Sequence, residues 1–413
     1  MKRIALYKTP DAMEPLFPIN IPIELENLAI DLLEKSAILT HSLNPITGIA
    51  IAEFLRPMNS FYSNLIEGHD THPIDIEKAL KGELSIEKTK RNLQLEANAH
   101  INVHRELFEE INALERINPY AEGYIKSIHN RFYSHLPEEF KNVITREGAT
   151  LVVEPGKFRT TEVEVGRHVA PKASALPVFM ERFHSFYTSK TNNKSHKIDR
   201  IIAVAASHHR LSWAHPFLDG NGRVARLFSD ALFMSLNINP FGLWTVSRGL
   251  ARVSNEYKMN LSKADSLRIN DFDGRGNLSN KRLIDFCTFF LEVAVDQVEF
   301  MLKVLDPESM KNRVINFAEL MIIKKELRPE ATFVLVELFK NGRISKKEAL
   351  WITRTSDKTL KLTIDKLVEM DLLNIRKEGK SMMYYAKYPI KYSPSLFPGL
   401  YPANKEIDML DNY

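Results

Sequence analysis

The chain of 413 residues contains a single cysteine, Cys287, and this scarcity excludes an intramolecular disulfide. Such cysteine usage is typical of proteins in a reducing compartment. The sequence also lacks apolar runs of the length that a signal peptide or a transmembrane helix requires. We therefore expect a cytoplasmic protein that has no membrane partner.

An excess of charge of one sign is missing as well, because 56 Lys and Arg residues face 52 Asp and Glu residues, a net charge of +4. This balance permits a nucleic-acid partner without requiring one. A hydrophobic content of 44% and a charged content of 26% are ordinary for a globular protein. The length allows two or three domains and a sizeable core.

Glycine is sparse, with 16 residues, yet two glycines flank Asn221 in the stretch 215–226, which reads HPFLDGNGRVAR. Gly-Asn-Gly predicts a tight turn. Apolar residues then recur at helical spacing from Arg223 to Met234, so a helix is expected to begin on the turn. A turn that leads into a helix N-terminus presents unpaired backbone N–H groups and a positive dipole end, which suits an anion.

The side chains of this stretch suggest a nucleotide-phosphate site. Arg223 and Arg226 are three residues apart and project to the same side of the predicted helix. Asp219 precedes the turn and could hold Mg²⁺ against the phosphates, while His215 could accept a proton at neutral pH. The alternative is a loop between core helices with solvated arginines, which a short glycine motif alone would favour. The combination within one short stretch favours the phosphate site.

The stretch resembles the signature of the Fic family, His-Pro-Phe-x-Asp/Glu-Gly-Asn-Gly/Lys-Arg-x-x-Arg. The resemblance implies AMP transfer from ATP to a hydroxyl of a protein side chain, with His215 as the base and Asp219 as the Mg²⁺ ligand. It implies that the nucleotide phosphates contact Gly220, Asn221, Gly222, Arg223 and Arg226. Gly222 favours AMP transfer over phosphate transfer, because the related Doc branch usually carries Lys at this position.

A second motif, SNLIEG at residues 63–68, predicts a helix C-terminus with Gly68 in the left-handed conformation. Glu67 is mildly unfavourable at the negative end of a helix dipole. Taken without the family resemblance, it is interpreted as a surface glutamate that the helix tolerates. The Fic resemblance instead implies an inhibitory helix at about residues 50–68, with Ser63, Glu67 and Gly68 as its motif. Glu67 would then pair with Arg226 and occupy the place of the γ-phosphate.

The residue pattern of the segment 148–171 differs from that of the helical sequence around it. Residues 151–153, a Pro155-Gly156 turn and the alternating residues 162–165 predict a β-hairpin. One interpretation is an exposed hairpin that has no functional role. The Fic resemblance implies a flap that aligns the target by main-chain pairing, with docking residues Gly156, Phe158 and Arg159. It also suggests an adenine contact for Tyr257, for which packing in the core is the alternative.

The expected fold is mainly α: a Fic-type helical bundle with a β-hairpin flap, followed by a winged helix-turn-helix domain. The helical run that carries Glu67 is expected to be interrupted near Pro57. The expected domains are an N-terminal helical region at 1–110, a catalytic core at 111–306, and a winged-helix-like domain with a tail at 307–413.

The winged-helix prediction rests on a helix from Thr332, a capping box that begins at Ser345, a helix capped by Ser356 and a hairpin at 372–385. Between residues 343 and 380, ten basic and six acidic residues leave a charge of about +4, which is weak for DNA binding. DNA and protein remain open as partners of this domain, because fold alone does not fix function.

The sequence thus predicts an autoinhibited enzyme that moves AMP from ATP to a Ser, Thr or Tyr hydroxyl of a protein target, with Mg²⁺ and release of pyrophosphate. Two alternatives stay open. The same site could remove AMP with a water molecule oriented by Glu67, or a nucleotide-sensing core could regulate DNA binding. The resemblance also allows self-modification and a homodimer, and it does not identify the target.

Overall fold

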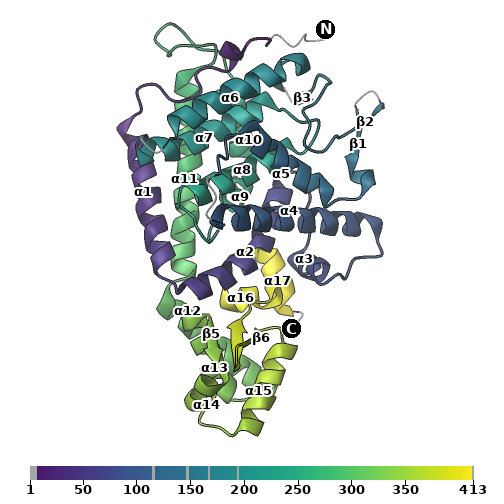
Figure 1. The fold of residues 1–413 in the computed structure, drawn as a ribbon, viewed down its shortest axis with the longest axis vertical. Helices are drawn as coiled ribbons and strands as arrows, with labels where there is room; N and C mark the ends of the chain where they lie inside the picture. The colour runs from purple at the N-terminus through teal and green to yellow at the C-terminus, as the bar shows by residue number, and fades with distance from the viewer. Residues whose placement is uncertain (1–6, 114–116, 146–147, 166–167, 193–194, 412–413) are drawn as a thin grey trace.

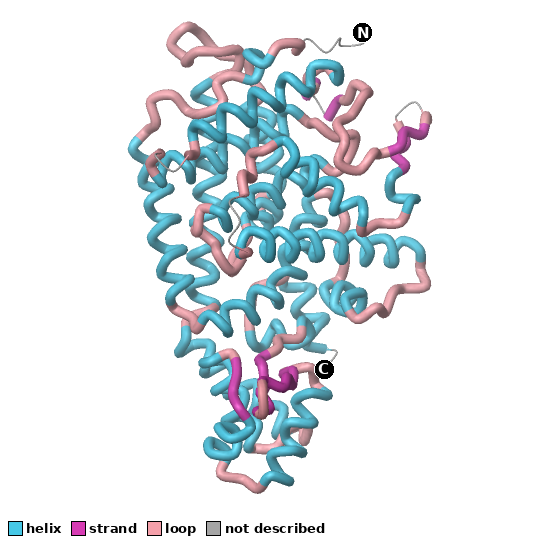
Figure 2. Tube along the Cα trace, viewed as in Figure 1, coloured by secondary structure: helices cyan, strands magenta, loops and turns pink. Residues whose placement is uncertain are grey.

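The computed structural model describes residues 7–113, 117–145, 148–165, 168–192 and 195–411, and most of these residues are helical (Figure 1). The mainly α prediction is confirmed. A large helical body forms one end of the elongated molecule, and a smaller unit that contains strands forms the other end (Figure 2). Within the described ranges, no helix is both long and apolar enough to cross a membrane.

The helices of the body are α1 Ile23–His41, α2 Pro45–Ile66, α3 Pro73–Leu80, α4 Lys88–Asn112, α5 Glu122–Ser134, α6 Leu176–Lys190, α7 Lys197–Ala214, α8 Asn221–Ser235, α9 Val246–Arg252, α10 Ser254–Ala264 and α11 Asn280–Val304. α1 lies along α11 at one edge (Figure 1). α7 and α8 pack on each other in the centre, and most of their residues are buried. α4 continues past residue 110, where the sequence predicts the first domain boundary.

α2 is unbroken from Pro45 to Ile66, so the predicted interruption near Pro57 is wrong. A proline inside a helix costs about 3 kcal/mol, because it removes one backbone hydrogen bond and crowds the preceding turn. α2 packs against α4 on one side and α9 on another, and it buries large apolar residues around the proline. Each such side chain contributes about 1.5–3 kcal/mol, so burial outweighs the defect.

The predicted hairpin between residues 151–153 and 162–165 is also wrong. β1 (Asn142–Ile144) pairs with β2 (Thr150–Val152), while β3 (Glu164–Val165) pairs with β4 (His168–Val169). The residues between β2 and β3 bond instead to the core, because Gly156 N–H donates to His129 and the Arg159 guanidinium donates to three backbone carbonyls. Of the predicted flap, residues 166–167 lie outside the described part.

The C-terminal unit has the element order of a winged helix-turn-helix. It contains α12 Pro307–Ile323, α13 Glu330–Asn341, β5 Arg343–Ser345, α14 Lys346–Thr353, α15 Asp357–Glu369, β6 Leu373–Glu378 and β7 Ser381–Ala386. The strands form an antiparallel sheet in the order β5-β7-β6. The predicted capping box is present at Ser345 and Glu348, and Ser356 caps α15.

The tail after the sheet returns to α2 and carries the short helices α16 (Ser393–Leu396) and α17 (Ala403–Asp411). The ring centroid of Phe397 lies 4.5 Å from that of Phe54 on α2. Tyr62 Oη donates to the carbonyl of Leu400 at 2.8 Å. α2 is therefore held from both sides: the body packs on one face and the C-terminal unit with its tail packs on another.

Candidate active site

The loop that joins α7 to α8 carries the first motif. α7 ends at Ala214, and His215 turns the chain with a left-handed φ of 44°. Gly220 has a φ of 77° and immediately precedes α8, which begins at Asn221 as the sequence predicts. The loop therefore directs the N-terminal N–H groups of α8 toward the side on which His215 lies, an arrangement suited to an anion.

The side chain of Asn221 fastens this loop from within. Its Oδ1 accepts from the Phe217 N–H at 2.9 Å, and its Nδ2 donates to the Phe217 carbonyl at 2.8 Å. The ring of Phe217 is fully buried and stacks on the ring of His129, with centroids 4.0 Å apart. The amide of Asn221 thus fixes the loop conformation, and the residue can meet a phosphate through its backbone N–H.

Arg226, one turn into α8, is held by α2. Its Nε donates to Ser63 Oγ at 2.9 Å, and its Nη2 donates to the Ser63 carbonyl at 2.9 Å. Nη2 also donates to Glu67 Oε1 at 2.6 Å. The Arg226 side chain is 1% exposed, whereas that of Glu67 is 35% exposed. The structure therefore brings together three residues that come from the two separate motifs of the sequence.

Glu67 reaches Arg226 because of the way α2 ends. Gly68 has the predicted left-handed conformation, with φ of 90°, and the His69 N–H bonds to the carbonyl of Asn64 at 3.0 Å. This is the Schellman arrangement of a helix end. Burial opposes the charge of Glu67, but the Arg226 guanidinium outweighs burial and holds the pKa of Glu67 below its ordinary value.

Gly222 leaves room for the Glu67 carboxylate. A Cβ atom built on Gly222 would lie 2.3 Å from Glu67 Oε1 and 3.1 Å from Arg226 Nη1. Contacts below 3.0 Å do not persist without movement, so any larger residue would displace the Glu67 carboxylate. The glycine thus allows a carboxylate to lie directly against the N-terminal turn of α8.

Arg223 lies between two carboxylates. Its Nη2 is 3.4 Å from Asp219 Oδ2, and its Nη1 is 3.4 Å from Glu96 Oε1. Asp219 Oδ2 also accepts from Tyr133 Oη at 2.5 Å. Burial disfavours the Asp219 carboxylate, but Arg223 and the Tyr133 hydrogen bond outweigh it and lower the pKa of Asp219. Asp219 is therefore ionised at neutral pH, and its side chain is 45% exposed.

His215 lines a cavity of about 410 Å³ together with Glu67, Asn221, Gly222 and Arg226. Burial, with the nearby His168 and Arg159, lowers the pKa of His215 to about 4. The imidazole is therefore neutral at pH 7 and can accept a proton. A general base, a helix N-terminus and a guanidinium thus line one cavity.

The predicted flap residues lie beside the loop. The Arg159 N–H donates to the Pro216 carbonyl, and Arg159 Nε donates to the His215 carbonyl, both at 2.9 Å. The Arg159 side chain is fully buried. Phe158 is partly buried, with its ring centroid 5.8 Å from that of Phe217. In this structure Arg159 therefore supports the loop backbone around His215.

Tyr257 also lines the cavity, but it is 3% exposed and its hydroxyl bonds to His208 Nε2 at 2.7 Å. Burial raises the pKa of this hydroxyl to about 12. The side chain thus packs in the core and also forms part of the cavity wall, so the adenine contact stays a prediction.

Sequence reasoning missed three residues that surround the loop: His129, Tyr133 and Glu96. His129 Nδ1 accepts from the Gly156 N–H at 2.9 Å, and its Nε2 lies 3.3 Å from the Asp219 carbonyl. Glu96 joins Arg223 and also pairs with His69. His129 and Tyr133 are four residues apart on α5, so their side chains share one face of that helix. This spacing of two polar aromatic residues is the signal in the sequence that could have identified them.

Asp219 is the carboxylate of the first motif, and its side chain is 45% exposed. No group of three or more His, Cys, Asp or Glu residues in the described ranges could hold a metal by itself. Mg²⁺ commonly binds through one or two carboxylates together with substrate phosphates and water. An ionised, half-exposed Asp219 next to a helix N-terminus fits that mode.

Residues 94–233 match the model of the Fic/DOC family. The protein adenylyltransferase Fic of Drosophila grimshawi is 39% identical to the chain over 88 residues, and that of Drosophila willistoni is 38% identical over 88 residues. These alignments cover 21% of this chain and 18% and 17% of the two relatives. The chain therefore spans less than a fifth of the length of the curated relatives it matches.

Two solved structures resemble the fold. A Fic family protein from Desulfovibrio desulfuricans aligns with a TM-score of 0.52 and 16% identity over 90% of this chain and 98% of that chain. A Fic domain containing signaling protein from Bacteroides thetaiotaomicron aligns with a TM-score of 0.50 and 17% identity over 67% and 97%. At these identities the likeness is one of fold, and it confirms the predicted helical bundle type.

Proposed function

We propose that this chain, which belongs to the Fic family through residues 94–233, is an autoinhibited enzyme that transfers AMP from ATP to a hydroxyl of a protein side chain. The observation that carries the proposal is the 410 Å³ cavity in which a neutral His215, the N-terminus of α8 and Arg226 meet. A base and an anion site on one cavity wall are what nucleotidyl transfer needs.

At the α-phosphorus, the reaction forms one bond and breaks one, and a proton moves from the hydroxyl to His215. The target hydroxyl oxygen attacks the α-phosphorus of ATP while its proton passes to His215, and the bond between the α-phosphorus and the bridging oxygen breaks. Pyrophosphate leaves with that electron pair. The N-terminal N–H groups of α8 and the two guanidinium groups of Arg223 and Arg226 stabilise the charge on the phosphates and the leaving group.

Mg²⁺ would be held by Asp219, and when bound it would neutralise phosphate charge. Tyr133 and Arg223 keep that carboxylate ionised and fixed in orientation. The chain itself thus holds the Asp219 carboxylate, which can only accept hydrogen bonds, beside the N-terminus of α8.

Inhibition follows from the ion pair between Glu67 and Arg226. With its guanidinium bound to Glu67 and Ser63, Arg226 cannot also hold the γ-phosphate, and the carboxylate repels the same phosphate. ATP that enters the cavity then lacks the anchor that aligns its α-phosphorus for attack.

A second reaction is favoured by one detail of Glu67. Within the described residues, its hydrogen bond to Arg226 engages Oε1 and leaves Oε2 able to orient a water molecule in the cavity. The same site would then remove AMP from a modified protein. Replacement of Glu67 by Gly should raise transfer and abolish removal, so the two reactions respond to this variant in opposite directions.

The test is incubation of the purified protein with Mg²⁺ and ATP labelled at the α- or γ-position, with and without a cell lysate. The lysate is the source of targets, and label on the protein itself measures self-modification. We expect α-label on protein with Glu67→Gly and none with Glu67→Gly combined with His215→Ala. His184→Ala in the Glu67→Gly background is the matched control, because His184 is a partly buried histidine on α6 outside the cavity. Transfer of γ-label, or α-label that persists without His215, would contradict the proposal.

A further inference from the structure

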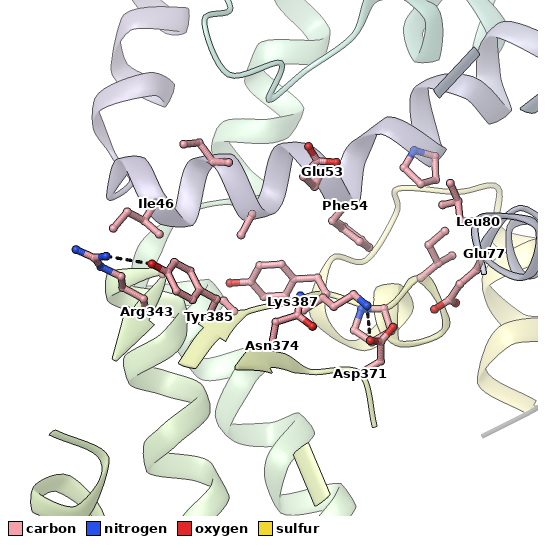
Figure 3. A pocket seen from close by; sticks show the side chains of 18 of the residues that line it. Ile46, Glu53, Phe54, Glu77, Leu80, Arg343, Asp371, Asn374, Tyr385 and Lys387 are labelled. Atoms are coloured by element: carbon pink, nitrogen blue, oxygen red, sulfur yellow. Dashed lines mark hydrogen bonds and ion pairs between the residues drawn. The ribbon is translucent and has the colours of Figure 1, made fainter. Parts of the chain in front are cut away.

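A second cavity, of about 610 Å³, lies between α2 and the C-terminal unit. Figure 3 shows Ile46, Glu53 and Phe54 projecting from α2 on one side, with Asn374 and Tyr385 of the C-terminal sheet on the facing side. Its size is within the range of about 300–1,000 Å³ that is typical of small-molecule sites, which often lie between domains. In the part of the chain that the structure describes, no residue lines both this cavity and the cavity at His215.

The wall formed by α2 is largely apolar, with Ile46, Ile49, Ala50, Phe54 and Pro57. Two tyrosine rings face it from the C-terminal unit, those of Tyr385 and Tyr388. A ligand that fills this space therefore buries an apolar body against aliphatic and aromatic surfaces, with about 25 cal/mol gained per Å² of apolar surface removed from water.

Most charges around the cavity are already neutralised. Asp371 pairs with both Lys81 and Lys387, and Lys81 also pairs with Glu77. Arg343 pairs with Glu378, and Glu53 pairs with Arg56 and Arg105. These groups hold the walls together and leave little net charge to attract a ligand.

Arg376 differs from these groups. Among the described residues, no carboxylate forms an ion pair with it, and its guanidinium lies 4.8 Å from the centre of the Tyr385 ring. Asn374 is two residues earlier on the same face of β6. Tyr388 Oη is buried and has no hydrogen-bond partner within the described part of the chain. One positive charge without an ion pair among the described residues, the exposed amide of Asn374 and the buried hydroxyl of Tyr388 suit a single anionic group.

α2 connects this cavity to Glu67. With 22 residues it is about 33 Å long, and Glu67 follows its last residue. Near its start, Thr47 Oγ1 donates to the Phe339 carbonyl at 2.8 Å. A Cβ atom on Gly342 would lie 2.5 Å from the Thr47 nitrogen, so the C-terminal unit approaches α2 as closely as a glycine permits.

We propose that this cavity binds a small organic carboxylate with an aromatic or branched apolar body, and that the bound molecule favours the arrangement in which Glu67 holds Arg226. The direction follows from the structure, because the cavity is open in the same state in which the ion pair is formed, and a ligand stabilises the state that it binds. The second part rests on the function proposed above.

Binding is tested by titration calorimetry with 4-phenylbutyrate and its neutral analogue 4-phenylbutyramide. We expect saturable binding of the carboxylate to the unmodified chain, about tenfold weaker binding of the amide, and a similar loss with Arg376→Gln. Lys377→Gln is the matched control, because Lys377 is the next basic residue on β6 and faces the opposite side of the sheet. Ala50→Phe, which fills the cavity from α2, should also weaken binding.

Equal binding of carboxylate and amide, equal binding by the Arg376 and Lys377 variants, or no binding up to about 10 mM would overturn the site. The regulatory part is tested with α-labelled ATP. We expect 4-phenylbutyrate to lower the residual transfer by the unmodified chain and to leave Glu67→Gly unchanged; an unaltered rate in the unmodified chain would overturn this part. If Glu67→Gly transfers no label, the proposed function fails, while the calorimetry still decides whether the site exists.

Discussion

The loop at residues 215–226 and the segment between β2 and β4 lie side by side, yet their backbones are fixed in different ways. In the loop, Asn221 bonds to Phe217, four residues away, in addition to the bonds from Arg159 to the carbonyls of His215 and Pro216. In the flap segment, Gly156 bonds to His129 and Arg159 bonds to His215 and Pro171. A conformation held by near neighbours can be read from a motif, whereas one held by distant partners cannot.

The largest expected effect is that of Arg159→Ala. It leaves the carbonyls of His215, Thr161 and Pro171 without their buried charged donor, so we expect a loss of about 3–5 kcal/mol in the free energy of unfolding and loss of AMP transfer. Urea unfolding measures the first effect, and label transfer in the Glu67→Gly background measures the second.

Arg248→Ala is the matched control for Arg159. Arg248 is also buried and donates to backbone carbonyls, those of Gly399 and Leu400 in the tail. We expect a comparable loss of stability with transfer retained. Equal loss of transfer in both variants would mean that Arg159 contributes only to general stability.

The two regions also explain what could be predicted from the sequence. The loop, the helix after it and the left-handed Gly68 followed from residues close in the chain. The predicted hairpin is absent because the Gly156 N–H bonds to His129 of α5 and the Arg159 guanidinium bonds to His215 of the loop, 27 and 56 residues away. Tyr133 could not be predicted for the same reason. Packing of α5 on α8 brings its hydroxyl to Asp219, which lies 86 residues further along the chain.

The pH dependence of stability that histidines contribute should arise in the body and not in the C-terminal unit. All 13 histidines precede residue 307. Burial lowers the pKa of His129 and of His215 to about 4, so the unfolded chain, with ordinary values near 6.5, binds more protons between those limits. Stability is then fully present above pH 6.5 and is lost as the pH falls toward 4, by about 2 kcal/mol per such histidine between pH 7 and 5.

Urea unfolding at pH 7, 6 and 5 measures this loss, with His129→Gln as the test variant. Its stability should fall less steeply with pH than that of the unmodified chain, by the share of one histidine. The same slope in both proteins would show that His129 does not remain neutral in the folded state.

Asn221→Ala should cost about 2 kcal/mol, because two buried backbone groups of Phe217 lose their partners. Asn239 provides a close comparison: it accepts from the Leu243 N–H at 2.8 Å and donates to the Trp244 carbonyl at 2.7 Å, in the loop after α8. We expect Asn239→Ala to destabilise the protein equally and to retain transfer in the Glu67→Gly background, whereas Asn221→Ala loses it. Similar transfer by both variants would mean that the loop conformation held by Asn221 is not needed for AMP transfer.

The smallest effect is expected for Ser63→Ala in the otherwise unmodified chain. It removes the bond from Arg226 Nε to Ser63 Oγ but keeps those to the Ser63 carbonyl and to Glu67, so Arg226 is held less firmly by about 1 kcal/mol. Transfer of α-label should rise about fivefold, well below the rise with Glu67→Gly. Ser60→Ala is the control, because its buried hydroxyl on the same helix bonds to the Ala97 carbonyl instead. A rise of equal size with Ser60→Ala would mean that loosening α2, rather than freeing Arg226, relieves the inhibition.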